Sequence, residues 1–228
     1  MNKLVFTAFL FLIGISLYSC KKETPPIIDY RIKTETNNNV TYQYSYLTPS
    51  GRIWYRYKNG YKYYSYHYAG DSIVETNYDY SGPGPPSKIT YFINKEGYII
   101  GNSFNQVYAY DSDWHKQEPA NAPNQYVYQY ENGNQMNISM NYVHDTTWFT
   151  YTYYPDKLEN RTKGLRAFLG SGNRNLMKSE HIVSTAAGTV NSEYSYEFDA
   201  KGRVIKETRI FTSSLGTTPV VTTYTYFD

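Results

Sequence analysis

Residues 194–211 have the sequence YSYEFDAKGRVIKETRIF, and this stretch contains the pattern on which the fold depends. At its start, Tyr194, Tyr196 and Phe198 alternate with polar residues. Because successive side chains of a β-strand point to opposite faces of a sheet, this alternation places the three aromatic side chains on one face. The apolar residues after Arg203 show no helical spacing, so we predict two strands joined by a turn.

Residues 199–202 (DAKG) predict the turn between these strands. Aspartate at the first position accepts hydrogen bonds from the backbone ahead of it, and glycine at the fourth adopts the positive φ that other residues resist. This pattern is typical of a type I turn followed by a left-handed glycine bulge. Turns of the same kind, or two-residue Asn-Gly turns, are predicted at four further places: 47–53 with Gly51, 93–99 with Gly97, 59–60 and 132–133.

Between the turns, many of the 29 tyrosines recur at every second position. This period of two indicates strands throughout the chain. The sequence therefore predicts an all-β fold, an antiparallel β-meander of successive hairpins that forms a strongly curved sheet, a half-barrel or a barrel. The alternating tyrosines are Tyr42, Tyr44 and Tyr46; Tyr55 and Tyr57; Tyr61 and Tyr63; Tyr64, Tyr66 and Tyr68; Tyr78 and Tyr80; Tyr108 and Tyr110; Tyr126, Tyr128 and Tyr130; Tyr151 and Tyr153; and Tyr224 and Tyr226.

One stretch, residues 159–178, lacks the alternation. Its Leu165, Phe168 and Leu169 have helical spacing, which predicts one short helix or compact loop near 160–175. The strand pattern is expected to resume at Ser179. Proline-rich segments at 81–87 and 118–125 predict loops, since proline cannot donate to a sheet.

The N-terminal segment predicts export. Lys3 precedes an apolar run, residues 4–17, that is shorter than the roughly 20 residues of a membrane-spanning helix. Residues 17–20 (LYSC) resemble the bacterial lipoprotein signal, although Tyr18 is bulkier than the usual residue there. That resemblance implies cleavage before Cys20 and acylation of its sulfur and its new amino group. The alternative is an ordinary secretory peptide with an incidental cysteine.

Three segments are predicted: a lipoprotein signal peptide (1–19), a lipidated tether (20–29) and a single tyrosine-rich β domain (30–228). Several acyl chains on Cys20 would hold the protein stably to a membrane. Cys20 is also the one cysteine of the sequence, so no internal disulfide is expected. Residues 21–23 (KKE) partly match the Bacteroidetes surface-export pattern. We expect an outer-membrane lipoprotein that faces the periplasm or the cell surface.

The chain also resembles a Bacteroidetes lipoprotein family of unknown function, described as having a porin-like β fold. The resemblance is carried by the lipoprotein signal, the tyrosine alternation, the stretch GLRAFLG…NLMKSE within residues 164–180, and the closing YEFDAKGRVIKETRI…TTYTYF. It implies a meander that curls into a half or closed barrel, and it implies no activity. The FDAKGR turn is also similar to YD repeats, a likeness we attribute to shared hairpin chemistry.

The best candidate for a metal site is Asp111, Asp113 and His115, with Glu118 beyond. A calcium loop of the EF-hand type requires a third oxygen ligand, a central glycine and a late glutamate. Here His115 replaces the oxygen, no glycine follows, and Ala122 occupies the late position. We therefore expect a solvated polar turn, with no metal and no cofactor.

The remaining titratable residues predict no catalytic site. His144, Asp145 and His181 lack partners at ligand spacing and are expected at the surface or on a sheet face. Common nucleophile, zinc and phosphate motifs are absent, so no enzyme is predicted. Two carboxylate pairs, Glu75 with Asp79 and Glu193 with Glu197, are of the kind any polar β protein contains.

The tyrosines have two interpretations. They build a thin sheet, because tyrosine buries a large apolar area and keeps a polar tip in water, or some of them line a ligand groove. Residues 71–73 (DSI) and 145–147 (DTT) resemble the three-residue O-glycosylation pattern of Bacteroidetes. The formal net charge of +2 gives no reason to expect nucleic acid as a partner.

We therefore predict a membrane-anchored envelope lipoprotein with no assigned activity. It would bind glycan, peptide or a neighbouring envelope protein through an aromatic β face, whose ligand-binding residues stay unassigned. Two alternatives remain open: an integral outer-membrane β-barrel, which the near-terminal Phe227 also suggests, and a hydrolase with an unrecognised site.

Overall fold

The computed structural model describes residues 31–47, 52–78, 85–112, 115–117, 126–141, 145–159 and 173–227. These residues form strands and connecting turns and contain no helix, which confirms the predicted all-β class. The signal segment, the tether and most of the predicted insertion near 160–175 lie outside the described residues. The strands are β1 (Ile32–Asn37), β2 (Val40–Tyr46), β3 (Ile53–Lys58), β4 (Tyr61–Ala69), β5 (Ser72–Asn77), β6 (Ser87–Ile93), β7 (Ile99–Asn102), β8 (Ala109–Tyr110), β9 (Lys116–Gln117), β10 (Tyr126–Glu131), β11 (Asn134–Asn141), β12 (Thr146–Leu158), β13 (Asn175–Ser184), β14 (Gly188–Phe198), β15 (Val204–Ser213) and β16 (Gly216–Tyr226).

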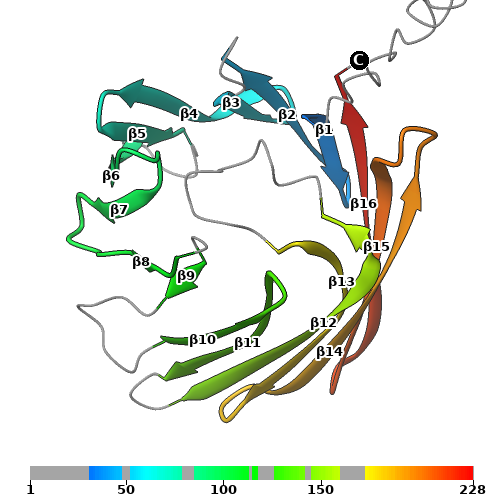
Figure 1. The fold of residues 1–228 in the computed structure, drawn as a ribbon. Helices are drawn as coiled ribbons and strands as arrows, with labels where there is room; N and C mark the ends of the chain where they lie inside the picture. Colours follow the sequence, from blue (N-terminus) through cyan, green and yellow to red (C-terminus); the bar gives the residue numbers. More distant parts are fainter. Residues whose placement is uncertain are drawn as a thin grey trace, which may run out of the picture.

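Fourteen of these strands form one antiparallel sheet in the order β10-β11-β12-β13-β14-β15-β16-β1-β2-β3-β4-β5-β6-β7. Nearly every neighbour in the sheet is also a neighbour in sequence, as expected of a meander. The exception is the pairing of β16 with β1, which joins the last strand to the first (Figure 1). The edges of the sheet therefore lie in the middle of the sequence, at β7 and β10.

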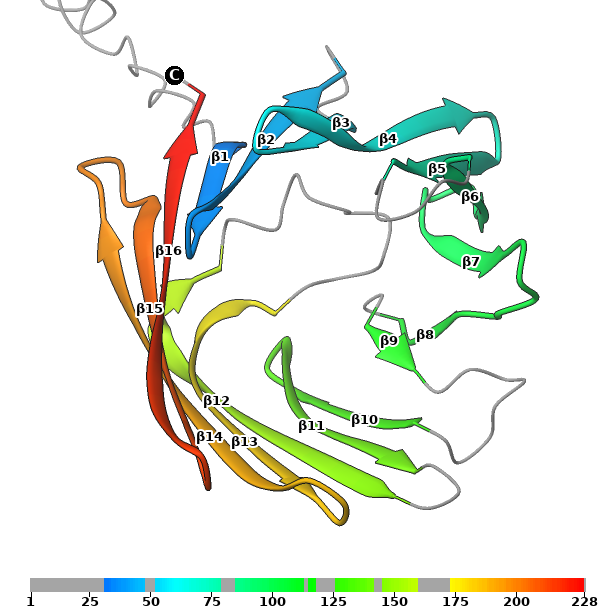
Figure 2. The same cartoon turned by 180° about the vertical axis from the view of Figure 1, so that it is seen from behind.

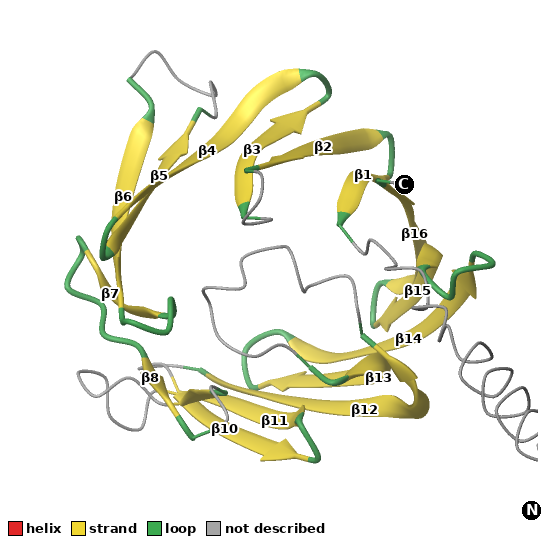
Figure 3. Ribbon diagram, turned by 45° about the horizontal axis from the view of Figure 1, so that its top comes forward, coloured by secondary structure: helices red, strands yellow, loops and turns green. Residues whose placement is uncertain are grey.

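The sheet curves into an incomplete ring, and the hairpin β8–β9 lies in the gap between β7 and β10 (Figures 1 and 2). A bridge between Gly101 and Val107 links this segment to β7. On the other side, the ring of His115 stacks on Tyr130 of β10, with the ring centroids 4.5 Å apart. The predicted strongly curved sheet is thus confirmed, and Figure 3 looks into the ring that it forms.

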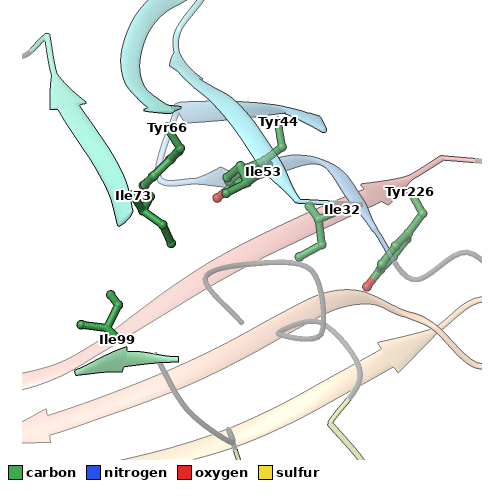
Figure 4. Packing of buried hydrophobic residues seen from close by; sticks show 7 residues of the cluster. All are labelled: Ile32, Tyr44, Ile53, Tyr66, Ile73, Ile99 and Tyr226. Carbon is green, nitrogen blue, oxygen red and sulfur yellow. The ribbon is translucent and has the colours of Figure 1, made fainter. Parts of the chain in front are cut away.

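The two faces of the sheet differ in burial as the alternation predicts. Along β16, Thr222, Tyr224 and Tyr226 face the inside of the ring and are less exposed than the residues between them. On β2, Tyr42, Tyr44 and Tyr46 face inward in the same way. Seven residues of the core form one cluster on this inner face: Ile32, Tyr44, Ile53, Tyr66, Ile73, Ile99 and Tyr226 (Figure 4). Tyr151, Leu176 and Val204 are buried as well.

A bulge in the β2–β3 pair turns one tyrosine pair to the outer face. Ile53 lies opposite Tyr46, whereas Tyr55 lies opposite Ser45, so the register shifts between the two pairings. The extra residue in β3 reverses the alternation. Tyr55 and Tyr57 consequently project outward, although their neighbours on β2 and β4 keep tyrosines inside.

The turn chemistry is confirmed where the structure describes it. Gly97 and Gly202 have φ values of 90° and 76°. In the second turn, the Asp199 carboxylate accepts hydrogen bonds from the backbone N–H groups of Lys201 (2.9 Å) and Arg203 (2.8 Å). Gly51 lies outside the described residues. The Asn-Gly turns at 59–60 and 132–133 also have positive φ at both residues, which suits a two-residue hairpin loop.

Replacing Gly202 by valine is expected to lower the free energy of unfolding by roughly 1–2 kcal/mol, because a β-branched residue resists positive φ. No atom lies within 4 Å of an added Cβ, so the loss comes from the backbone. Gly202→Asn should cost less, since asparagine tolerates the left-handed region of positive φ. Ala200→Val should also cost less, because Ala200 is not among the residues with positive φ. Urea unfolding of the unacylated chain measures all three, and equal stability of Gly202→Val and Gly202→Asn would contradict the assignment.

Strand β13 begins at Asn175, four residues before the predicted resumption at Ser179. Asn175 donates its backbone N–H to Asn134 Oδ1 (2.8 Å) and accepts a bond from the Asn134 side chain (3.0 Å). Leu176, the next residue, is fully buried. The prediction of Ser179 was wrong because these long-range contacts, rather than local alternation, extend the strand.

Candidate binding surfaces

Several of the inner tyrosines donate hydrogen bonds to neighbouring strands. Burial raises the pKa of Tyr68 to about 12, so its hydroxyl stays protonated at neutral pH and donates. These bonds join neighbouring strands, so the tyrosines that make them act as parts of the sheet. The pairs are Tyr44 to Glu35 Oε2 (2.6 Å), Tyr46 to the Ile32 carbonyl (2.9 Å), Tyr68 to that of Ile53 (2.9 Å), Tyr153 to that of Gln135 (2.6 Å), Tyr196 to that of Met177 (2.9 Å) and Tyr226 to that of Val204 (2.6 Å).

An ion pair crosses the inner face between β13 and β15. Arg209 Nη2 lies 2.6 Å from Glu180 Oε2, and the Arg209 guanidinium also donates to Ser192 Oγ (2.9 Å) on the strand between them. Tyr194 donates to the same carboxylate at 3.4 Å. Burial and the nearby Glu180 raise the pKa of Tyr194 to about 12. The carboxylate is satisfied by these neighbours, which makes the group structural.

Asp111 and His115 come together in the turn between β8 and β9. The Asp111 carboxylate accepts the backbone N–H of His115 (2.9 Å) and lies 3.1 Å from His115 Nδ1. His115 is only 8% exposed, so the expectation of a fully solvated turn was wrong for this residue, because its ring packs on Tyr130. Asp113 and Glu118 lie outside the described residues. In the part of the chain that the structure describes, no three acidic, histidine or cysteine residues gather to hold a metal.

Of the other two carboxylate pairs singled out from the sequence, the structure describes both members of one, Glu193 and Glu197. Glu75 is buried on the inner face, and its proposed partner Asp79 lies outside the described residues. Glu193 and Glu197 are four positions apart on β14, about 13 Å along a strand. Glu197 instead pairs with Lys206 at 2.7 Å. Glu193 and Glu197 therefore form no shared site.

The histidine and glycosylation candidates lie at the rim and outer face. His181 is exposed and lies 2.6 Å from Asn191 Oδ1, as expected of a sheet-face residue. Asp145 accepts bonds from the hydroxyls of Thr185 (2.6 Å) and Ser184 (3.1 Å), and the Thr185 hydrogen bond is the main cause of its lowered pKa. Ser72 donates to the Ala69 carbonyl at 3.0 Å. His144 lies outside the described residues.

The outer face of β10, β11 and β12 carries a hollow of about 310 Å³. Trp148 of β12 projects into this region and is 45% exposed. It pairs across the sheet with Ser139, while its neighbour Thr150 pairs with Asn137. Asn137 Nδ2 donates to Gln129 Oε1 at 2.9 Å. The lining residues are Val127, Gln129, Asn137, Ile138, Ser139, Trp148, Phe149 and Thr150.

Sequence reasoning missed this hollow, because its residues come from three strands. One local signal points to it. In the stretch from Thr146 to Thr152, the inward positions hold Phe149 and Tyr151, while Trp148 stands among threonines at the outward positions. A tryptophan at the polar positions of an alternating strand predicts an exposed indole.

A second aromatic group lies on the outer face of β3 and β4. Trp54 is 44% exposed and its ring lies 4.5 Å from that of Tyr55. The Lys62 ammonium lies 4.2 Å from the Tyr55 ring centroid, a cation–π contact. This group is thus partnered within the protein, whereas Trp148 makes no ring or cation–π contact with the residues that the structure describes.

A larger hollow of about 460 Å³ lies where the β10–β11 turn meets β12 and β13. The hydrogen-bonded pair Asn134 and Asn175 borders it, together with Glu131 and Arg174. Arg174 also packs on the turn, with its Cβ close to the position that a Cβ on Gly133 would take (3.2 Å). These contacts fix the turn against the start of β13.

The protein belongs to the class of all-β proteins built from one curved antiparallel sheet. A solved porin-like protein from Bacteroides uniformis superimposes with a TM-score of 0.61 at 12% identity, over 86% of this chain and 98% of that one. A porin-like protein from Bacteroides vulgatus gives a TM-score of 0.42 at 9% identity, over the same shares of the two chains. No family model matches the sequence, and no curated protein matches it either. The likeness to the first structure supports the porin-like fold expected from the sequence.

Among the described residues there is no helix long and apolar enough to cross a membrane.

Proposed function

We propose that this protein is a lipid-anchored envelope protein whose β domain binds a ligand in water beside the membrane. The observation that carries the proposal is the LYSC stretch at 17–20, which ends an apolar run and contains the one cysteine of the sequence. The tether that follows contains Pro25 and Pro26, which favour an extended chain. Such an anchor would leave the folded domain close to the membrane surface without inserting it.

The outer face of the sheet supports a position in water. Strands of a membrane barrel present a continuous apolar band to lipid. Here the outward positions of β13 to β16 carry many polar and charged side chains. They include Ser179, His181, Asn191, Glu193, Lys206, Thr208, Thr223 and Thr225, with Ile210 and Val221 between them. Burying these groups in lipid without partners would be unfavourable, so we favour the anchored domain over the integral barrel.

A binding role, rather than catalysis, is part of the proposal. The inner carboxylates Glu35 and Glu180 are engaged by a tyrosine hydroxyl and by an arginine. The outer face instead presents an exposed indole beside amide and hydroxyl side chains. Groups of this kind recognise ligands by stacking and hydrogen bonds, and the described residues that line the hollow include no histidine or carboxylate to act as a general base.

Replacing Cys20 by alanine is expected to abolish lipidation. In a Bacteroides host fed an alkyne-tagged palmitate, the natural chain should carry the label and sediment with membranes. Cys20→Ala should carry no label and should leave the membrane fraction after a salt wash. A label that persists in Cys20→Ala would contradict the proposal. An unlabelled Cys20→Ala chain that needs detergent for extraction would instead support the integral barrel.

A further inference from the structure

We propose that the hollow around Trp148 binds the pyranose ring of a neutral glycan. This inference deepens the proposed binding function and rests on it. The ring would lie on the indole face of Trp148, and its hydroxyl groups would meet the amides and hydroxyls of β10, β11 and β12.

Trp148 is the stacking surface. Its indole lies on the outer face of β12 with 45% of the residue exposed. Within the described residues it makes no ring contact, and its indole N–H makes no hydrogen bond. An indole presents a broad apolar face with a polar edge. The C–H groups of a pyranose ring form a complementary apolar face, while its hydroxyls point outward around the edge.

Gln129 and Asn137 are positioned to read those hydroxyls. Their side chains already bind each other at 2.9 Å, which fixes the orientation of both amides. The bond uses one N–H of Asn137 and the carbonyl oxygen of Gln129. It leaves the Gln129 amide N–H groups as donors and the Asn137 carbonyl oxygen as an acceptor. Neighbouring sugar hydroxyls act as both donors and acceptors, so they match such a pair.

Thr150 and Ser139 complete the polar border of the site. Thr150 lies directly across from Asn137, and Ser139 lies across from Trp148. The same row continues over the outer face to His181 and then Asn191. A glycan chain that runs across the strands would therefore meet further polar side chains beyond the hollow.

The described residues that line the hollow carry no charge, which indicates a neutral ligand. None of the eight lining residues is Asp, Glu, Lys, Arg or His. A sulfated or uronic acid glycan, a phosphate or a nucleic acid would need a cation to offset its desolvation. The volume, about 310 Å³, falls at the lower end of the range for small-ligand sites, roughly 300–1,000 Å³.

The test measures glycan binding by the full-length lipoprotein in detergent micelles. The probes are cello-, xylo-, malto- and manno-oligosaccharides, with oligogalacturonate and heparin fragments as the charged set. Titration calorimetry gives the affinity, and tryptophan fluorescence reports the stacking. At least one neutral oligosaccharide should bind, with a change in tryptophan emission, and the charged set should bind no better.

Three variants locate the site. Trp148→Ala should lower the affinity for the neutral oligosaccharide about tenfold or more, and Asn137→Ala should lower it by a smaller factor. The matched control is Trp54→Ala, which removes an outer tryptophan of the same exposure (44%) that is not among the residues lining the hollow. That variant should keep its affinity within about twofold. Near-ultraviolet circular dichroism checks that each variant is folded.

Two results would overturn the inference. One is the absence of binding to every neutral oligosaccharide; the other is an affinity that survives Trp148→Ala. Neither result would contradict the lipid anchor, which is tested separately. Palmitate labelling and membrane association of Trp148→Ala should equal those of the natural chain. If the protein carried the palmitate label but bound only charged glycans, the inference of a neutral-glycan site would be wrong, whereas the proposal of a lipid-anchored binding protein would still hold.

Discussion

Replacing Tyr66 by alanine is expected to lower the free energy of unfolding by about 3–5 kcal/mol, since truncating a buried aromatic side chain loses its packing and leaves a cavity. Tyr66 is only 1% exposed and belongs to the inner cluster. It lies on β4 opposite Glu75, itself buried. Urea unfolding of the unacylated chain, followed by tyrosine fluorescence and far-ultraviolet circular dichroism, measures the loss.

The same strand provides the control. Tyr61 begins β4 and is 78% exposed. Tyr61→Ala should change the free energy of unfolding by less than about 0.5 kcal/mol, as surface substitutions usually do. If the two variants were equally stable, the buried cluster around Tyr66 would not contribute to the core, and the assignment of that core would be wrong.

Replacing Arg209 by methionine is expected to lower the free energy of unfolding by roughly 1–3 kcal/mol, because the largely buried Glu180 carboxylate loses its charged partner. The Glu180 side chain is 13% exposed and lies 2.6 Å from Arg209 Nη2. Ser192 and Tyr194 would remain as neutral partners of the carboxylate. Thermal and urea unfolding at neutral pH measure the effect.

Removing both charges should be less harmful than removing one. The double variant Arg209→Met with Glu180→Gln should be more stable than Arg209→Met alone, since no buried charge then lacks a partner. As a control, Lys206→Met breaks the exposed ion pair between Lys206 of β15 and Glu197, which lies opposite it on β14. That loss should stay within about 1 kcal/mol. A double variant as unstable as the sum of its parts would mean that packing, rather than charge, governs this position.

Local features of the fold were predictable because their causes are local. The DAKG turn at 199–202 depends on the Asp199 side chain and on a glycine at positive φ, and both are within four residues. The strands around it follow from side chains that alternate between two faces. Where a distant contact intervened, the prediction was wrong: Asn134 lengthens β13 at Asn175. The burial of His115 was missed for the same reason, since Tyr130 lies on another strand.

By itself, the sequence determined the all-β class, the hairpin turns at 97 and 202, and one sheet face rich in tyrosine, because period-two alternation and turn residues act over a few positions. Only the tertiary structure decided that β16 pairs with β1 and that the open edges fall at β7 and β10. It also decided that several inner tyrosine hydroxyls bond to neighbouring strands, and that an exposed Trp148 lies beside Gln129 and Asn137. Those features depend on which strands become neighbours and on how far the sheet curves, and both are set by packing across the whole ring.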